Sequence, residues 1–161
     1  MRIMDDLSVL LRIGAALAVG AVLGLNRDIR GKPAGVRTHG LVSVGSATVL
    51  LVAIQAGAGA EGVSRVLQGL LAGIGFLGAG VIIHHQTRHR VHGLTTAASI
   101  WVSAGLGAAC GAGLVALAAI ALAAGLIVLI AGGPIERAFE RQLGRREDPA
   151  AQPGGGEPPA A

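Results

Sequence analysis

The chain alternates long apolar runs with short polar stretches. The first run, residues 7–25, contains Ser8 and Arg12 among apolar positions, and two further runs follow at residues 40–57 and 66–83. As a helix, about 19 residues extend roughly 28 Å, which is close to the thickness of the hydrocarbon core of a bilayer. The pattern therefore predicts three membrane-spanning helices, with Arg12 reaching outward to the interface.

The next apolar run is too long for one span. Residues 94–131 form 38 consecutive positions without a charged residue. A helix of that length would measure about 57 Å, nearly twice the bilayer core. The run must reverse, and residues 110–113, which include two glycines, are the predicted turn. The sequence thus predicts an all-α membrane protein, a bundle of about five transmembrane helices.

The end of the chain differs in composition. We expect Pro134 to stop the last helix and residues 135–143 to form a short amphipathic helix at the interface. The remainder is rich in Pro, Gly and charge, which predicts a disordered tail. We therefore divide the chain into a transmembrane domain, residues 1–133, and a segment, residues 134–161, that holds the amphipathic helix and a cytoplasmic tail.

The composition agrees with a membrane protein. Of the 161 residues, 52% are hydrophobic and 14% are charged, against roughly 25% charged residues in soluble domains. The net charge of +4 does not indicate nucleic-acid binding, because the basic residues lie between apolar runs and form no basic face. The larger number of Lys and Arg on one side of the predicted spans predicts an N-terminus outside and a C-terminus in the cytoplasm. The predicted cytoplasmic residues are Arg27, Arg30, Lys32, Arg37, Arg88, Arg90, Arg137, Arg141, Arg145 and Arg146, against Arg2 and Arg65 outside.

Glycine is frequent, with 27 residues, which favours close helix packing. Residues 73–78 match the G-x-G-x-x-G spacing of dinucleotide sites, but they lie in an apolar run, and no acidic residue occurs between Glu61 and Glu136 to hold a ribose. An alternative is that these glycines break the third helix around a binding site. The predicted packing residues are Gly20, Gly24, Gly69, Gly73, Gly75, Gly78 and Gly80, with the pair Gly107 and Gly111, and Trp101 inside the bundle.

Histidines gather in the polar stretch 84–93. His85 and His89 would share one face of a helix, where two imidazoles could bind one metal ion. Arginines lie among them and would repel a divalent cation, and the stretch has no carboxylate. We therefore expect no metal and no cofactor, and interpret the stretch as a polar loop beside anionic lipid headgroups. The histidines are His84, His85, His89 and His92, and the single Cys110 permits no intramolecular disulfide.

The polar stretch between the first two runs is the most chemically varied. Arg27, Asp28 and Arg37 border the membrane, where ion pairs are stronger than at an open surface. Two interpretations stay open: the acid is a structural partner, or the stretch is a recognition surface for a partner protein or a phosphate-bearing ligand. The candidate polar residues here and at the start of the fourth span are Asn26, Arg27, Asp28, Lys32, Arg37, His39, Thr95 and Thr96.

Polar residues also mark the fourth span. Thr95 and Thr96 begin it, and a hydroxyl there can cap the free N–H groups of the first turn. Trp101 lies roughly 10 Å into the helix, deeper than the interfacial belt where tryptophan is usual. Ser99 and Ser103 flank it, and we expect them to hydrogen-bond to neighbouring helices.

Distinctive blocks of sequence follow one another along the predicted helices: GLNRD at 24–28, GKPAGVRTH at 31–39, GIGFLGAG at 73–80, and GLTTAA at 93–98 followed by Trp101. In these blocks, and through residues 8–131, the chain resembles the MgtC/SapB family of bacterial inner-membrane proteins. It is similar to short members that lack the soluble C-terminal domain of longer ones. The family usually has Glu where this chain has Asn26.

The resemblance implies a function connected with growth at low magnesium and, in pathogens, survival inside phagocytes. It implies a multi-pass protein of the bacterial inner membrane that regulates a membrane ATPase or the membrane potential. The expected partners are membrane lipid and a membrane protein such as an ATPase. A monomeric bundle and a homo-oligomer are both compatible with the glycine content.

We accordingly expect a protein that is not an enzyme and that supports Mg²⁺ or membrane-energy homeostasis through a membrane partner. No catalytic constellation is visible in the sequence. The alternative is a transporter or channel for a divalent cation. Such proteins usually carry carboxylates within the membrane, and the predicted spans contain none, which places this alternative second.

Overall fold

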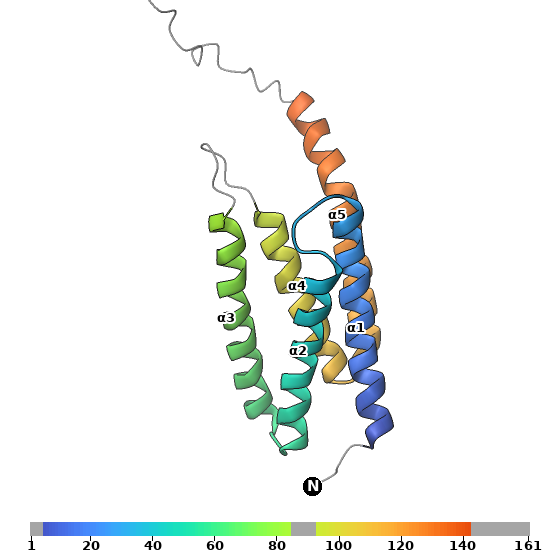
Figure 1. The fold of residues 1–161 in the computed structure, drawn as a ribbon, viewed down its shortest axis with the longest axis vertical. Helices are drawn as coiled ribbons and strands as arrows, with labels where there is room; N and C mark the ends of the chain where they lie inside the picture. The colour runs from blue at the N-terminus through green and yellow to red at the C-terminus, as the bar shows by residue number, and fades with distance from the viewer. Residues whose placement is uncertain (1–4, 85–92, 143–161) are drawn as a thin grey trace, which may run out of the picture. The chain divides into compact units, whose positions relative to one another are not determined.

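All regular elements in the described part of the chain, residues 5–84 and 93–142 of the computed structural model, are helices (Figure 1). Each contains a stretch long and apolar enough to cross a membrane. The all-helical, multi-pass arrangement predicted from the apolar runs is therefore confirmed. The helices are α1 (Asp6–Ile29), α2 (Val36–Gln55), α3 (Ala60–His84), α4 (Leu94–Gly111) and α5 (Val115–Gln142).

Helices α2 and α4 form the centre of the bundle. Consecutive helices run in opposite directions (Figure 1), and α4 packs against α1, α2 and α3, while α2 packs mainly against α1 and α4. Of the membrane-spanning stretch of α4, 56% of the residues are buried, against 6% for α3. A polar side chain is therefore shielded from lipid mainly where α1, α2 and α4 meet.

Glycines of α1 and α4 let both helices contact the backbone of α2. A Cβ atom at Gly20 of α1 would lie 2.6 Å from the carbonyl oxygen of His39, closer than atoms can approach. A Cβ atom at Gly107 of α4 would overlap the carbonyl oxygen of Ser43. Close backbone approach of this kind requires glycine. The glycines at these two interfaces are Gly20, Gly24, Gly107 and Gly111.

The glycines of α3 lie differently from the expectation. A Cβ atom at Gly78 would make an ordinary contact with Ala97, at 3.4 Å. At the other predicted positions an added Cβ would meet no described atom within 4 Å, so they bring no other helix of this chain close to α3. Helix α3 is also continuous, which contradicts the alternative of a helix broken around a site. The open positions are Gly69, Gly73, Gly75 and Gly80.

Trp101 lies on the outer face of α4, so its expected place inside the bundle was wrong. It is 48% exposed, whereas its neighbours Ile100 and Ala104 are 2% and 0% exposed. The buried face of α4 continues one turn later at Gly107, and Trp101 falls outside this 3.6-residue series. The indole therefore faces the surroundings of the bundle.

Arg12 turns inward instead of reaching outward as expected. Its Nη1 donates a hydrogen bond of 2.8 Å to the carbonyl oxygen of Gly111, the last residue of α4. A cation at a helix C-terminus is favourable, because the unpaired carbonyls there carry partial negative charge. Arg12 thus joins α1 to the end of α4.

The predicted stop at Pro134 was also wrong. Proline removes one backbone donor, yet α5 continues through it to Gln142. The expected amphipathic helix is, as far as Gln142, the end of α5. Contacts divide the described residues into two compact units, with the division between Val128 and Leu129, within α5.

Candidate functional site

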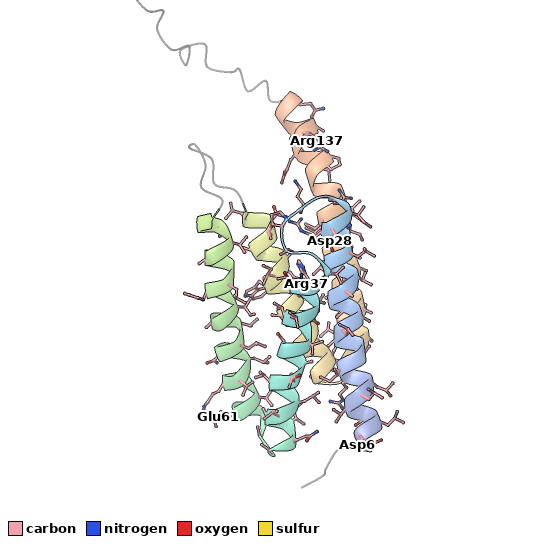
Figure 2. All side chains as sticks on the ribbon, viewed as in Figure 1. Asp6, Asp28, Arg37, Glu61 and Arg137 are labelled. Atoms are coloured by element: carbon pink, nitrogen blue, oxygen red, sulfur yellow. The ribbon has the colours of Figure 1, made fainter. Side chains whose placement is uncertain are left out.

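The candidate polar residues gather at one end of the bundle, where α1 ends and α2 and α4 begin. We call it the basic end, after Arg27, Arg30, Lys32 and Arg37. Figure 2 shows Asp28 and Arg37 at this end, whereas Asp6 and Glu61 lie at the opposite end. The polar stretch between the first two apolar runs, residues 26–39, is helical at both ends, because α1 extends to Ile29 and α2 begins at Val36.

Arg27 is buried where α1 meets α4. Its side chain is 4% exposed, and its Nη2 donates a hydrogen bond of 2.7 Å to Oγ1 of Thr96, which is 3% exposed. A hydrogen bond from a charged donor in a site shielded from water is stronger than one between neutral groups in water. This bond links two helices whose contacting residues lie 69 positions apart.

His39 continues the polar contacts from α4 into α2. The ring is fully buried, with Nδ1 3.0 Å from the carbonyl oxygen of Gly35 and Nε2 3.1 Å from Oγ of Ser99. A carbonyl oxygen only accepts hydrogen bonds, so Nδ1 carries a hydrogen. The Ser99 hydroxyl also lies 2.8 Å from the carbonyl oxygen of Thr96. Its single hydrogen therefore has two acceptors in reach, Thr96 O and, in a neutral ring, His39 Nε2.

Two serines extend these contacts toward the middle of the bundle. Ser103 of α4 donates to the carbonyl oxygen of His39 at 2.9 Å, and Ser43 of α2 donates to that of Ala16 in α1 at 2.6 Å. Both serines are fully buried. We call Arg27, His39, Ser43, Thr96, Ser99 and Ser103 the polar network; it ties α1, α2 and α4 together without any carboxylate among its members.

Asp28 has a separate partner. Its Oδ2 accepts a hydrogen bond of 2.9 Å from the backbone N–H of Val36, in the first turn of α2. The carboxylate lies so close to Gly35 that a Cβ atom there would overlap it. A negative charge at a helix N-terminus is favourable. Of the two interpretations of this acid, the structure supports the structural one, with the partner being a helix end instead of an arginine.

A cleft of about 490 Å³ opens beside Asp28 and the first turns of α2. Its walls are partly apolar, and Arg37 is the one basic residue among them. Because the Asp28 carboxylate also faces it, the cleft does not have a uniformly positive surface. The lining residues are Asp28, Ala34, Gly35, Val36, Arg37, Thr38, Leu41 and Val42.

The remaining candidates lie outside the polar network. Lys32 and Arg37 are exposed, and so is Thr95 in the first turn of α4. The expected threonine cap does not form: the N-cap position of α4 is Gly93, without a side-chain cap hydrogen bond, and the hydroxyl of Thr96 accepts from Arg27. The first turn of α4 thus keeps backbone N–H groups that no described side chain satisfies.

Two buried polar atoms at the basic end lack a partner in the described part of the chain. They are Oδ1 of Asn26 and Nε of Arg27. Among the described residues the only ion pair is that of Arg65 with Glu61, in the first two turns of α3. The buried guanidinium of Arg27 therefore has no described carboxylate beside it.

Sequence reasoning missed Ser43, Ser46 and the role of Arg12. A signal existed: His39, Ser43 and Ser46 lie four and three residues apart, so the polar residues of α2 share one helix face. Thr96, Ser99 and Ser103 lie three and four residues apart, so they likewise share one face of α4. Two apolar helices that each carry such a polar face are expected to turn those faces toward one another.

The histidine stretch, with the metal pair considered for it, lies outside the described residues, apart from the backbone of His84 at the end of α3. Within residues 5–84 and 93–142, no group of three or more His, Cys, Asp or Glu side chains is placed to hold a metal ion. Cys110 is buried and free.

Comparisons with known proteins point to one family. The sequence model described as "MgtC family" matches residues 13–138. Protein SrpB of Synechococcus elongatus is 49% identical over 121 residues, which cover 68% of this chain and 66% of that protein. Protein MgtC of Salmonella typhimurium is 39% identical over 132 residues, or 82% of this chain and 54% of that protein. Protein MgtC of Brucella abortus is 38% identical over 134 residues, which cover 83% of this chain and 55% of that protein.

The chain thus spans between about half and two thirds of the length of these relatives. No solved structure shows significant similarity to it.

Proposed function

Because the chain belongs to the MgtC family, we propose that it supports Mg²⁺ and membrane-energy homeostasis of a bacterium, including growth at low magnesium. It does so by regulating a membrane ATPase or another membrane protein, from the inner membrane and with its basic end in the cytoplasm. Five apolar spans and relatives named MgtC support this proposal.

The observation that carries the choice of regulation over ion transport is the buried guanidinium of Arg27. It lies in the polar network between α1, α2 and α4, where a cation crossing the bundle would find its polar contacts. A fixed positive charge in a site of low dielectric repels a divalent cation strongly. No Asp or Glu of the described residues is buried to offset it.

The basic end offers the surface on which a partner would be recognised. Arg30, Lys32 and Arg37 are exposed there, on the short segment around the start of α2. Guanidinium groups bind carboxylates of a partner through paired hydrogen bonds. We therefore place the regulatory contact on this end of the bundle.

A flux measurement separates regulation from transport. Purified protein is reconstituted into sealed vesicles that contain a magnesium dye, and magnesium entry is compared with that of protein-free vesicles. We expect equal entry in both, since regulation requires no ion path through the bundle. Protein-dependent entry that an Asp28→Ala variant reduces would overturn the proposal in favour of a transporter.

A growth assay tests the regulatory role itself. A host lacking the gene is complemented at low magnesium with the wild type, with Arg37→Ala, or with Arg65→Ala as the matched control. Both arginines are exposed and lie near a helix start, but at opposite ends of the bundle. We expect only Arg37→Ala to lose complementation while its membrane level, read by immunoblot, stays normal. Full growth with this variant would contradict the proposed contact surface.

A further inference from the structure

Among the residues that the structure describes, the surroundings of Arg27 contain positive charge without an ion-paired anion. We propose that an anion with phosphate chemistry binds at the basic end between Arg27 and the first turn of α4. This inference goes beyond the proposed regulatory function and does not depend on it. It rests on the burial of Arg27 and, within the described part of the chain, on its unpartnered Nε and on a first turn of α4 without a side-chain cap.

The first step is the charge of Arg27. An arginine remains protonated in proteins, so a side chain that is 4% exposed places a full positive charge inside the bundle. Isolated buried charges are costly, and proteins pair them with an opposite charge. The sequence contains no Asp or Glu between Glu61 and Glu136, so α4 and the chain on either side of it cannot supply one.

The second step is the helix end that Arg27 reaches. Its Nη2 bonds Thr96, in the first turn of α4. A helix N-terminus carries partial positive charge, so a cation beside it is unfavourable unless an anion lies near both. No acidic residue lies in this turn, and its N-cap residue, Gly93, has no side chain to occupy the free N–H groups.

Helix α2 provides the internal comparison. It begins at the same end of the bundle, and its N-cap residue, Gly35, is a glycine as well. There the Asp28 carboxylate bonds the first turn and supplies the negative charge. Of the two neighbouring helix starts, one has an anion from the chain, and the other has a buried cation instead.

The third step is access and ligand class. Leu94 is 58% exposed and Thr95 is exposed, so a ligand can reach the N–H groups of this turn. Arg27 bonds this turn through Nη2, and its buried Nε has no partner among the described residues, so a side-chain movement of Arg27 would bring Nε to a ligand. Phosphate oxygens suit both partners, because arginine binds them through its planar fork and helix N-termini bind them through N–H groups. A lipid headgroup and free phosphate share this chemistry.

The test is thermal unfolding of the purified protein in nanodiscs, read from the single Trp101. One arm adds inorganic phosphate to phosphatidylcholine discs, with chloride at equal ionic strength as reference. The other arm replaces part of the lipid with phosphatidic acid. We expect a higher midpoint temperature in at least one arm, and the responding arm identifies the source of the phosphate. No rise in either arm would overturn the proposal.

Variants assign the response to residues. In Arg27→Gln we expect the half-saturating phosphate or lipid concentration to rise at least about tenfold, since one charge-assisted hydrogen bond is lost. Arg37→Gln removes an exposed arginine of the same end and is expected to keep the response. Loss of the response in Arg37→Gln with retention in Arg27→Gln would overturn the assignment.

Asn26→Asp keeps the proposal testable if Arg27→Gln does not fold. It introduces a carboxylate at the position next to Arg27 on α1, where Oδ1 of Asn26 is buried without a partner among the described residues. A built-in anion is expected to raise the midpoint temperature without phosphate and to abolish the further rise with phosphate. A normal phosphate response in Asn26→Asp would contradict the proposal that phosphate binds at the Arg27 site.

Discussion

Single side chains at the basic end show how polar groups are tolerated in an apolar bundle. Leaving a buried polar group without a partner costs about 1–3 kcal/mol by mutational estimates, so hydrogen bonds are nearly obligatory there. His39 meets this demand at both ring nitrogens, through Gly35 and Ser99. Asn26 and Arg27 meet it incompletely. Asn26 and Arg27 are therefore the residues at which a bound ligand would gain most from new hydrogen bonds.

Asp28 is a residue whose substitution has a defined expected cost. Asp28→Ala removes both the acceptor for the Val36 N–H group and the charge at the start of α2, and is expected to destabilise the protein by about 1 kcal/mol. Asp28→Asn keeps an acceptor and should lose less. Stability is read from the reactivity of the Cys110 thiol, which is fully buried in the folded protein, with a fluorogenic maleimide during heating.

Asp6→Ala is the control for this prediction. Asp6 lies in the first turn of α1, at the opposite end, and accepts no hydrogen bond from a described residue. Asp6→Ala should lower the stability of the protein clearly less than Asp28→Ala does. Equal losses would mean that Asp28 acts only through the general charge of a helix start.

Among the helices, contact distance is set by which glycines face a neighbour. Gly20 and Gly107 place α1 and α4 directly against the backbone of α2. Hydrogen bonds between helices become possible at that distance, as between Ser43 and Ala16. Among the described residues, most glycines of α3 make no such backbone contact, and α3 is mostly exposed, which leaves its glycine-rich side to lipid or to another protein.

A matched pair of glycines on α4 tests this view. Gly107→Ala would force a methyl group against the carbonyl oxygen of Ser43, and an overpacked interface costs about 1–3 kcal/mol. At Gly105 an added methyl meets nothing within 4 Å, so Gly105→Ala should be neutral or slightly stabilising through helix propensity. The Cys110 reactivity assay measures both. Similar behaviour of the two variants would contradict a backbone contact between α4 and α2.

For the protein as a whole, the distribution of charge predicts the orientation in the membrane. The basic end carries Arg27, Arg30, Lys32 and Arg37, whereas the described part of the opposite end carries Arg65, paired with Glu61, and Arg12, bonded to Gly111. Segments rich in Lys and Arg next to a membrane span are retained on the cytoplasmic side during insertion. We therefore expect the basic end to face the cytoplasm.

Single cysteines in a Cys110→Ala background test this orientation. The thiol of Glu61→Cys, at an exposed position, is expected to react with a membrane-impermeant maleimide in intact spheroplasts. The thiol of Arg37→Cys, also at an exposed position, should react only after the membrane is permeabilised. The reverse pattern would invert the orientation and would move the proposed contact surface and anion site to the outside.

The number of spans and the turn before α5 follow from local properties of the sequence. An apolar run is long enough to cross the bilayer or it is not, and Gly113, with a φ of 83°, sits in the turn where the long run was expected to reverse. The candidate residues of the GLNRD and GKPAGVRTH blocks could likewise be named in advance, because charge beside an apolar run is visible in one dimension. Neither inference needs to know which helices are neighbours.

Which of these residues meet was decided by the packing of the helices. Arg27 with Thr96, and Arg12 with Gly111, join positions far apart in the chain, and their pairing depends on the rotation of each helix about its axis. The same rotation puts Gly107 in contact, leaves Gly73 open and turns Trp101 outward. In a chain that is apolar on nearly every side, hydrophobic periodicity does not define this rotation. Backbone approach at glycine and hydrogen bonds between helices define it instead.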